Sequence, residues 1–272
     1  MLPVSNTAYF CCGIRYDDSQ SNEPLINDTY SEMFMSDEGF SIYRNFHANK
    51  YANRNILTRH FMIDKAVESY IASTDEEVTF ISIGSGLESR AFRAKSGNWI
   101  EIDEHQVIAY KDQRLPVDQC ANKLIRIGVD FTGDELDRAL IGIDVKSKVV
   151  VIVEGVFVYL DEKQIIETLK LMKHRLGEHV VITDFITKDF IDKYSKGFDK
   201  GVNALGAYYI PLKDPSGPFM GEHYQLLNKE SVTNEALKRF GFWIMRLMLN
   251  MFMPSYIQGY TVAILRYNGK ES

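Results

Sequence analysis

Short apolar runs alternate with longer polar stretches along the middle of the chain. Five runs have the length and β-branched content of buried strands, at residues 78–86, 98–103, 123–130, 148–160 and 178–186. The segments between them are compatible with helices, and strands that alternate with helices indicate a parallel sheet covered on both faces. One more run, at residues 260–267, predicts a last strand. The pattern therefore predicts an α/β fold.

The clearest helix signal lies between the fourth and fifth runs. Asp161 is placed to cap a helix whose apolar positions recur at helical spacing, and Gly177 follows where such a helix ends. Residues 187–229 instead form a long stretch rich in glycine, tyrosine and charge, which is typical of a lid or a substrate wall, with an ordinary variable surface insertion as an equal alternative. The run FWIMRLMLNMFM (242–253) is apolar enough for a core strand or for burial against a partner chain.

Composition narrows the classes of protein that fit. The chain has 272 residues, 45% hydrophobic and 25% charged, which are values of an ordinary globular protein without repeats or linkers. No apolar run reaches the ~20 residues of a membrane helix, and MLPVSNTAYF lacks the pattern of a secretory signal. Three cysteines without disulfide or metal spacing favour the cytoplasm, and a net charge of −6 argues against nucleic-acid binding. Oligomeric state stays open.

Four predicted strands end in glycine or in a carboxylate. In an open parallel sheet, ligands bind beyond the carboxyl ends of the strands. The candidates at these ends are Gly84, Ser85 and Gly86 after the first strand, Asp103 after the second, Asp130 and Phe131 after the third, and Glu154 after the fourth. Each alone has an ordinary explanation, as a tight turn or a helix cap. Together they predict a binding site for a nucleoside-containing cofactor.

Two cofactor classes fit these positions. Asp103 lies 17 residues after Gly86, close to the offset of ~20 at which an acidic side chain meets ribose hydroxyls. A dinucleotide fingerprint requires a third glycine or alanine, where this chain has Ser89. That difference weakens an NAD(P)-dependent oxidoreductase without excluding it. An adenosine cofactor without a pyrophosphate, with S-adenosylmethionine as the leading candidate, fits better.

Three segments carry a family resemblance: FISIGSGLESRAFR, WIEIDEHQVIAYK and VVVIVEGVFVYL. They resemble the leucine carboxyl methyltransferase family, including its bacterial relatives from polyketide pathways. The family comprises class I S-adenosylmethionine-dependent O-methyltransferases. The resemblance implies a Rossmann-like, mostly parallel seven-stranded sheet with helices on both faces. It implies one domain, 1–272, with a helical N-terminal cap (1–76), a cofactor-binding core (77–186), a substrate lid insertion (187–229) and a C-terminal helix and strands (230–272).

The resemblance also implies a role for each site residue. Arg15 and Arg59 hold the methionine carboxylate of the cofactor, and Glu154 binds its amino group or a neighbouring water. The turn Gly84-Ser85-Gly86 approaches the methionyl and ribose parts, and Asp103 takes the ribose hydroxyls. Asp130 and Phe131 bind the adenine, and Tyr159 falls on the substrate side as the candidate catalytic residue. For Arg90, surface solvation or helix support is at least as good an interpretation as catalysis.

The predicted reaction is in-line methyl transfer without a metal. A carboxylate acceptor is already ionised at neutral pH and needs no general base, whereas an alcohol or phenol needs one. We therefore expect the carboxylate of a small molecule or peptide, held by a local cation and by tyrosines such as Tyr194, Tyr208, Tyr209 and Tyr224. The alternatives are an NAD(P)-dependent oxidoreductase on a similar fold and a non-catalytic S-adenosylmethionine-binding module.

Overall fold

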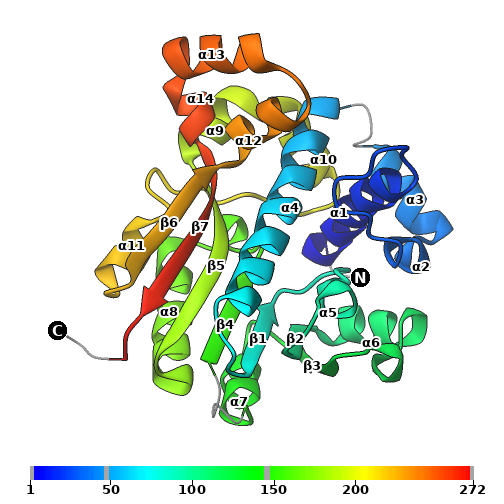
Figure 1. The fold of residues 1–272 in the computed structure, drawn as a ribbon, viewed down its shortest axis with the longest axis vertical. Helices are drawn as coiled ribbons and strands as arrows, with labels where there is room; N and C mark the ends of the chain where they lie inside the picture. The colour runs from blue at the N-terminus through cyan, green and yellow to red at the C-terminus, as the bar shows by residue number, and fades with distance from the viewer. Residues whose placement is uncertain (1–2, 46–48, 144–147, 270–272) are drawn as a thin grey trace.

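The computed structural model describes residues 3–45, 49–143 and 148–269. Its centre is a seven-stranded sheet with the order β3-β2-β1-β4-β5-β7-β6 (Figure 1). The strands are β1 Val78–Ile83, β2 Asn98–Glu104, β3 Lys123–Val129, β4 Lys148–Val153, β5 His179–Ile186, β6 Gln225–Ser231 and β7 Tyr260–Tyr267. The first five are parallel, and β7 is antiparallel to both neighbours, β5 and β6. The predicted fold class, a mostly parallel seven-stranded Rossmann-like sheet, is confirmed.

Helices fill most of the connections between strands. They are α1 Pro3–Ser19, α2 Ser31–Phe34, α3 Asp37–Arg44, α4 Lys50–Ala72, α5 Arg90–Arg93, α6 His105–Arg114, α7 Glu135–Ile141, α8 Glu162–Leu176, α9 Lys188–Tyr194, α10 Lys196–Ala204, α11 Gly217–Gly221, α12 Val232–Arg239, α13 Trp243–Phe252 and α14 Pro254–Gln258, with short 3-10 turns η1 Val117–Gln119 and η2 Phe157–Tyr159. Helix α8 begins with the predicted cap, because the Asp161 carboxylate accepts from the Gln164 N–H at 2.8 Å.

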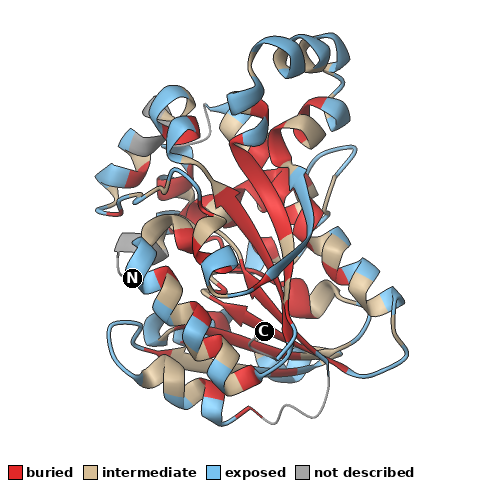
Figure 2. Cartoon of the chain, turned by 90° about the vertical axis from the view of Figure 1, so that its left-hand side faces the viewer, coloured by how far each residue is buried: buried red, intermediate tan, exposed pale blue. Residues whose placement is uncertain are grey.

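Successive strand residues point to opposite faces of the sheet, and helices bury each face. Phe80 packs in the cluster that includes Ile63 and Val67 of α4, whereas the next residue, Ile81, packs in the cluster that includes Leu169 of α8. The central strands β1, β2, β4, β5 and β7 are accordingly buried between helices whose outer faces are exposed (Figure 2). This alternation explains why continuous apolar runs predict the strands well.

The N-terminal helices form a third apolar cluster beside α4. Tyr9 of α1 and Phe34 of α2 pack there with Leu87, which follows β1, and with Val107 of α6. Figure 1 shows α1, α2 and α3 grouped to the right of α4, opposite β6 and β7. Because Leu87 and Val107 follow the ends of β1 and β2, the N-terminal helices cover the edge where the predicted site lies.

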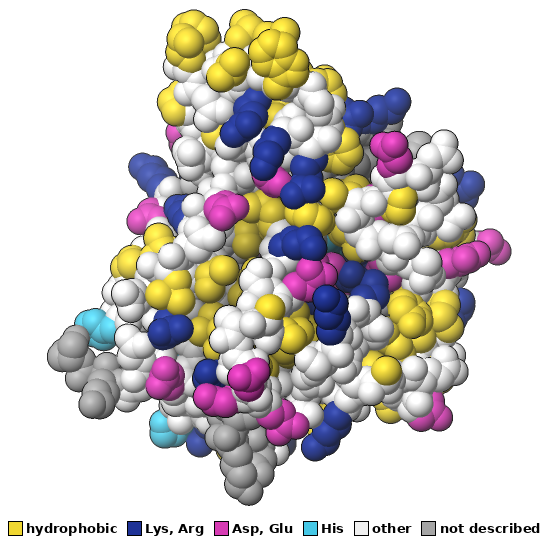
Figure 3. Space-filling model, in the orientation of Figure 1, with side chains coloured by type: hydrophobic (Ala, Val, Ile, Leu, Met, Phe, Trp, Pro, Cys, Tyr) yellow, Lys and Arg dark blue, Asp and Glu magenta, His cyan; other side chains and the backbone are white. Residues whose placement is uncertain are grey.

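The C-terminal part corrects one prediction. Residues 242–253 form no core strand: α13 is a helix whose polar Arg246 and Asn250 bond Asn234 of α12, at 2.8 and 3.1 Å. Its large apolar side chains are exposed instead, up to 71% for Met251, and gather at one end of the molecule (Figure 3). The prediction failed because it followed the apolar composition and not the helical spacing of the two polar residues, Arg246 and Asn250, which lie four positions apart. No helix in the described ranges is long and apolar enough to cross a bilayer.

Candidate active site

A cavity of about 830 Å³ opens beyond the carboxyl ends of β1, β2 and β4. The strand order reverses between β1 and β4, and such a switch point leaves a crevice that connecting helices do not fill. The lining comes from the turns after these strands, from α1 and α4, and from η2, α9 and α14. The volume lies in the upper part of the range for small-molecule sites.

The turn after β1 depends on its two glycines. Gly84 has a φ of +68° and Gly86 of +51°, a left-handed conformation that other residues adopt at a cost. A Cβ on Gly84 would lie 2.4 Å from Cγ2 of Val156, and one on Gly86 would lie 3.3 Å from the Cβ of Ala8. The glycines therefore keep backbone close to the cavity without filling it.

Asp103 at the end of β2 faces the same turn. Its Oδ2 accepts from the Gly86 N–H at 2.5 Å, and its Oδ1 accepts from the Glu104 N–H at 2.7 Å. Burial raises the pKa of Asp103 to about 6, although both backbone hydrogen bonds act to lower it. A carboxylate held in this way retains lone pairs that can accept from ligand hydroxyls.

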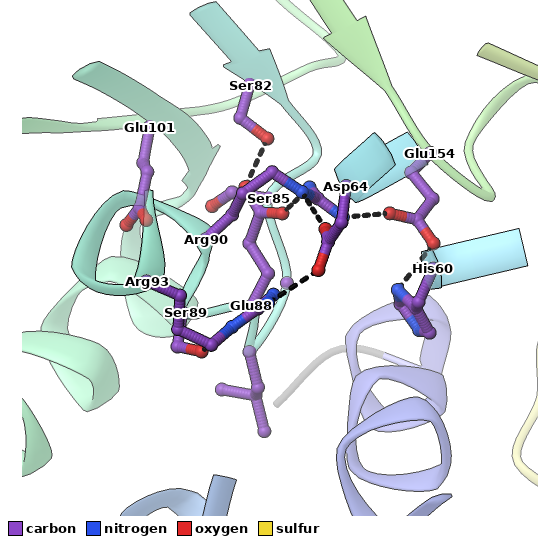
Figure 4. A network of polar contacts seen from close by, with 12 residues as sticks. His60, Asp64, Ser82, Ser85, Glu88, Ser89, Arg90, Arg93, Glu101 and Glu154 are labelled. Atoms are coloured by element: carbon purple, nitrogen blue, oxygen red, sulfur yellow. Dashed lines mark hydrogen bonds and ion pairs between the residues drawn. The ribbon is translucent and has the colours of Figure 1, made fainter. Parts of the chain in front are cut away.

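Glu154, directly after β4, is the centre of a buried ionic network (Figure 4). Its Oε1 contacts Nε of Arg59 at 2.9 Å and Nδ1 of His60 at 2.6 Å, and its Oε2 accepts from Nη2 of Arg90 at 2.8 Å. Burial acts to raise the pKa of Glu154, but these three partners lower it well below its usual range. Glu154 is therefore ionised at neutral pH.

His60 connects Glu154 to Arg15. Nη1 of Arg15 lies 3.3 Å from Nε2 of His60, and an arginine can only donate, so Nε2 accepts and the proton resides on Nδ1. Nδ1 then donates to Glu154. Burial lowers the pKa of His60 to about 4, with Arg15 and Arg59 acting in the same direction. The imidazole is thus neutral, with both nitrogens engaged.

The arginines around the cavity each have carboxylate partners. Arg15 binds Asp28 at 2.8 Å and the Leu87 carbonyl at 2.6 Å. Arg90 is 2% exposed and also contacts Asp64 and Glu88. This charge pairing matters because an unpaired charge at such depth would cost several kcal/mol. The network fixes the arginine side chains before any ligand binds.

Tyrosines line the other end of the cavity, which we call the tyrosine chamber: Tyr51, Tyr159, Tyr194, Tyr209, Tyr256 and Tyr260. The rings of Tyr159 and Tyr209 lie 5.2 Å apart, and those of Tyr194 and Tyr256 lie 4.7 Å apart. Tyr260 Oη accepts from Nη1 of Arg59 at 3.0 Å, so the chamber adjoins the Glu154 network. Burial raises the pKa of Tyr159 to about 12, which keeps its hydroxyl protonated.

The structure brings nearly all of the predicted site residues to one cavity. Its lining includes Arg15, Arg59, Gly84, Ser85, Gly86, Asp103, Phe131, Glu154 and Tyr159. Asp130 is outside that lining: its side chain is exposed, and its Oδ1 accepts from the backbone and hydroxyl of Thr132, at 2.8 and 2.6 Å. Among the predicted substrate-side tyrosines, Tyr194 and Tyr209 line the cavity. Tyr208 is exposed and Tyr224 is buried against His179.

The sequence did not predict that several other residues belong to this network. They are His60, as a hydrogen-bond partner of Glu154, together with Asp28, Asp64, Glu88, Asp184 and Tyr260. Arg90, for which a surface position was one interpretation, is instead buried in the network. The one available signal was helical spacing, because His60 and Asp64 lie four positions apart, on one face of a predicted helix that precedes the first strand.

The fold and the cavity define a Rossmann-like protein with a cofactor site at the switch point of its sheet. The chain belongs to the leucine carboxyl methyltransferase family, whose model matches residues 11–173, more than half of the sequence. The predicted family is therefore confirmed. The match spans α4, the glycine turn, Asp103 and Glu154, and it ends within α8.

A curated relative supports the same class. A Mycobacterium tuberculosis protein named "Putative S-adenosyl-L-methionine-dependent methyltransferase" is 26% identical over 185 residues, which cover 58% of this chain and 57% of the relative. A Mycobacterium bovis protein of the same description matches equally. The aligned part thus spans little more than half the length of the curated relatives.

Solved structures share the fold at low identity. A DUF574 family protein from Streptomyces avermitilis has a TM-score of 0.62 and 12% identity, covering 92% of this chain and 98% of that one. Magnesium protoporphyrin IX methyltransferase from Synechocystis, solved with bound SAH, has a TM-score of 0.52 and 11% identity, covering 85% and 94%. These similarities support the fold alone.

The family and its relatives support S-adenosylmethionine as the cofactor, and the cavity residues fit that group. Asp103 offers a carboxylate suited to ribose hydroxyls, and Phe131 and Leu136 offer apolar surface for a base. Ionised Glu154 suits an ammonium, and the arginines beside it suit a carboxylate. The two glycines leave room for a ligand along the turn.

Proposed function

We propose that the protein is an S-adenosylmethionine-dependent O-methyltransferase that methylates a carboxylate of a small molecule or peptide, in line and without a metal. The observation that carries this proposal is the continuity of one cavity. It runs from Asp103 and the glycine turn, past Glu154 and Arg59, into the tyrosine chamber. A donor site and an acceptor site that share one cavity allow two reactants to be held close and aligned.

The cofactor, when bound, supplies a methyl group on a sulfonium. Asp103 binds the ribose hydroxyls, and the Gly84–Gly86 turn lets backbone approach the ligand. Glu154 binds the ammonium, while Arg15 and Arg59 bind the methionine carboxylate; Phe131 covers the adenine. These roles are consistent with the positions of the side chains in the cavity. The aromatic walls exclude water from the acceptor oxygen, which strengthens electrostatic interactions there.

The state of His60 supports a carboxylate acceptor. Among the described residues of the cavity lining, His60 is the only histidine, and Arg15 and Glu154 already use both of its nitrogens. An ionised carboxylate needs no proton removed before it attacks. Tyr159 has a raised pKa and so donates a hydrogen bond to the acceptor rather than acting as a base. Within the described ranges, no cluster of three or more His, Cys, Asp or Glu could hold a metal ion.

The test uses S-adenosylmethionine with a labelled methyl group. The wild-type protein is incubated with the labelled cofactor and a cell extract, and products are sorted by sensitivity to mild base. We expect base-labile label, because methyl esters hydrolyse under these conditions. Label found only in base-stable products would contradict carboxylate specificity.

Thermal shift separates the alternative functions. Stabilisation by SAH without any labelled product would favour a non-catalytic binding module. Stabilisation by NAD(P) alone would favour the oxidoreductase. Family membership favours neither alternative.

A further inference from the structure

The tyrosine chamber has a composition that restricts the acceptor. Besides its six tyrosines, the lining residues nearby include Phe190 and Ile191 of α9, Ile186 at the end of β5, and Val202 of α10. Phe190 stacks on Tyr256 at 5.6 Å and contacts Tyr260 at 5.8 Å. The wall is thus a continuous aromatic and aliphatic surface with tyrosine hydroxyls.

Charged side chains are scarce in the tyrosine chamber. Among the described lining residues from η2, α9, α14, β7 and the first ten residues of α4, Arg59 is the only charged side chain. Its guanidinium is already balanced by Glu154 at 2.9 Å and by Asp184 at 3.6 Å. A second negative charge on an acceptor would lose its hydration here without gaining a cation of its own, and that loss is costly.

The tyrosine hydroxyls stay neutral. Burial raises the pKa of Tyr209 well above its usual value, with Tyr159 adding to the effect, and burial likewise raises the pKa of Tyr260. Protonated hydroxyls can donate to one acceptor oxygen or carboxylate. Their oxygens and rings can also receive a cation, as Tyr260 Oη accepts from Nη1 of Arg59, so the restriction applies to a second negative charge.

We propose that the tyrosine chamber binds a monocarboxylic acid whose body is apolar and carries no second negative charge, with the carboxylate held by tyrosine hydroxyls beside Arg59. The proposal rests on the proposed methyltransferase function and narrows its acceptor. An acid with a second negative charge, such as a dicarboxylate, is excluded. Affinity then follows the apolar area that the acid buries in the chamber.

A homologous series tests this inference. Butanoate, pentanoate, hexanoate and octanoate, with glutarate as the dicarboxylate partner of pentanoate, are titrated calorimetrically into the SAH-loaded protein. Each added methylene is expected to tighten binding about fourfold, from ~0.8 kcal/mol per buried CH₂. Glutarate is expected to bind at least about tenfold more weakly than pentanoate, because its second carboxylate is desolvated. Equal affinity for all the acids of the series, or tighter binding of glutarate than of pentanoate, would overturn the inference.

Two neighbouring tyrosines provide matched variants. Tyr209 lines the chamber, whereas Tyr208 is 63% exposed and outside it. Tyr209→Ala should reduce the gain per methylene, Tyr209→Phe should keep it because the ring remains, and Tyr208→Ala should leave the series unchanged. The same gain in affinity per methylene in Tyr209→Ala and wild type would overturn the assignment of the chamber as the binding site of the acid.

The SAH titration that precedes the series separates this inference from the proposed function. If SAH fails to bind the wild-type protein, the proposed function itself is wrong, and the inference that rests on it falls with it. If SAH binds and the series is flat, the cofactor site stands and only the acceptor class is wrong.

Discussion

Two buried neutral histidines predict a specific loss of stability in acid. The perturbations are His60→Asn at the cavity and His179→Asn at the start of β5. His60 lies between Arg15 and Glu154. His179 lies between the Gly177 carbonyl at 2.7 Å and the Tyr224 hydroxyl at 2.9 Å. Burial lowers the pKa of each to about 4.

The sign of the effect follows from proton uptake. In the unfolded chain a histidine has a pKa near ~6.5, so it gains a proton as the pH falls below that value, while the folded protein does not take it up until about pH 4. Each histidine therefore lowers the free energy of unfolding as the pH falls from ~6.5 to ~4. At about 1.4 kcal/mol per pH unit, the loss reaches about 3 kcal/mol for each histidine.

Denaturant titrations at several pH values measure this loss as a difference between proteins. Asp103 acts in the opposite sense over ~3.8 to 6, because its raised pKa favours proton uptake by the folded state. The wild-type curve alone is therefore a sum of effects, whereas the difference between wild type and each variant isolates the histidine. If His60→Asn loses stability between pH 6.5 and 4 as steeply as wild type, the assignment of a neutral, buried His60 is wrong.

The same pair of variants separates structure from binding. His179 is at the amino end of β5 and is absent from the cavity lining, whereas His60 contacts Glu154. Both variants should flatten the acid response, but only His60→Asn should weaken SAH binding at pH 7.5. Equal SAH affinity in the two variants would show that His60 does not position Glu154.

Three further variants test other parts of the account. Gly84→Ala should destabilise the protein by about 1–2 kcal/mol or more, read from denaturant midpoints, because of its φ of +68° and its approach to Val156; unchanged stability would contradict this. Lys111→Met should cost ~3 kcal/mol, since it leaves the buried Glu101 with one fewer cation, and a loss below ~1 kcal/mol would contradict the ion pair's importance. Asp130→Asn should leave the denaturant midpoint unchanged, because the side chain is exposed and Asn can still accept from Thr132; a clear loss of stability would contradict this.

The sequence predicts the parallel core well because buried strands leave a strong signal. All five predicted parallel strands are present, with ends that differ by a few residues, since β1 and β4 stop before the glycines that follow them. The strand β6 had no prediction, because it lies exposed at the edge of the sheet and has no apolar alternation: its only apolar residues, Leu226 and Leu227, are adjacent. For α13 the composition was misleading, since its apolar side chains face outward.

The site is only partly predictable for a different reason. Residues at strand ends, such as Asp103 and Glu154, come together because of topology, and the alternation of elements reveals topology. Contacts such as Arg59 with Glu154 join residues 95 positions apart on different elements. No local pattern encodes which arginine meets which carboxylate, so the network appears only when the chain is folded.

SAH is expected to bind at the carboxyl ends of the strands through Asp103. Calorimetric titration of SAH into wild type, Asp103→Ala and the exposed control Asp134→Ala measures this. We predict one SAH per chain, a loss of about tenfold to a hundredfold in Asp103→Ala from the lost hydrogen bonds to a charged acceptor, and no change in the control. Absence of SAH binding to wild type, or equal affinity in wild type and Asp103→Ala, would contradict the claim.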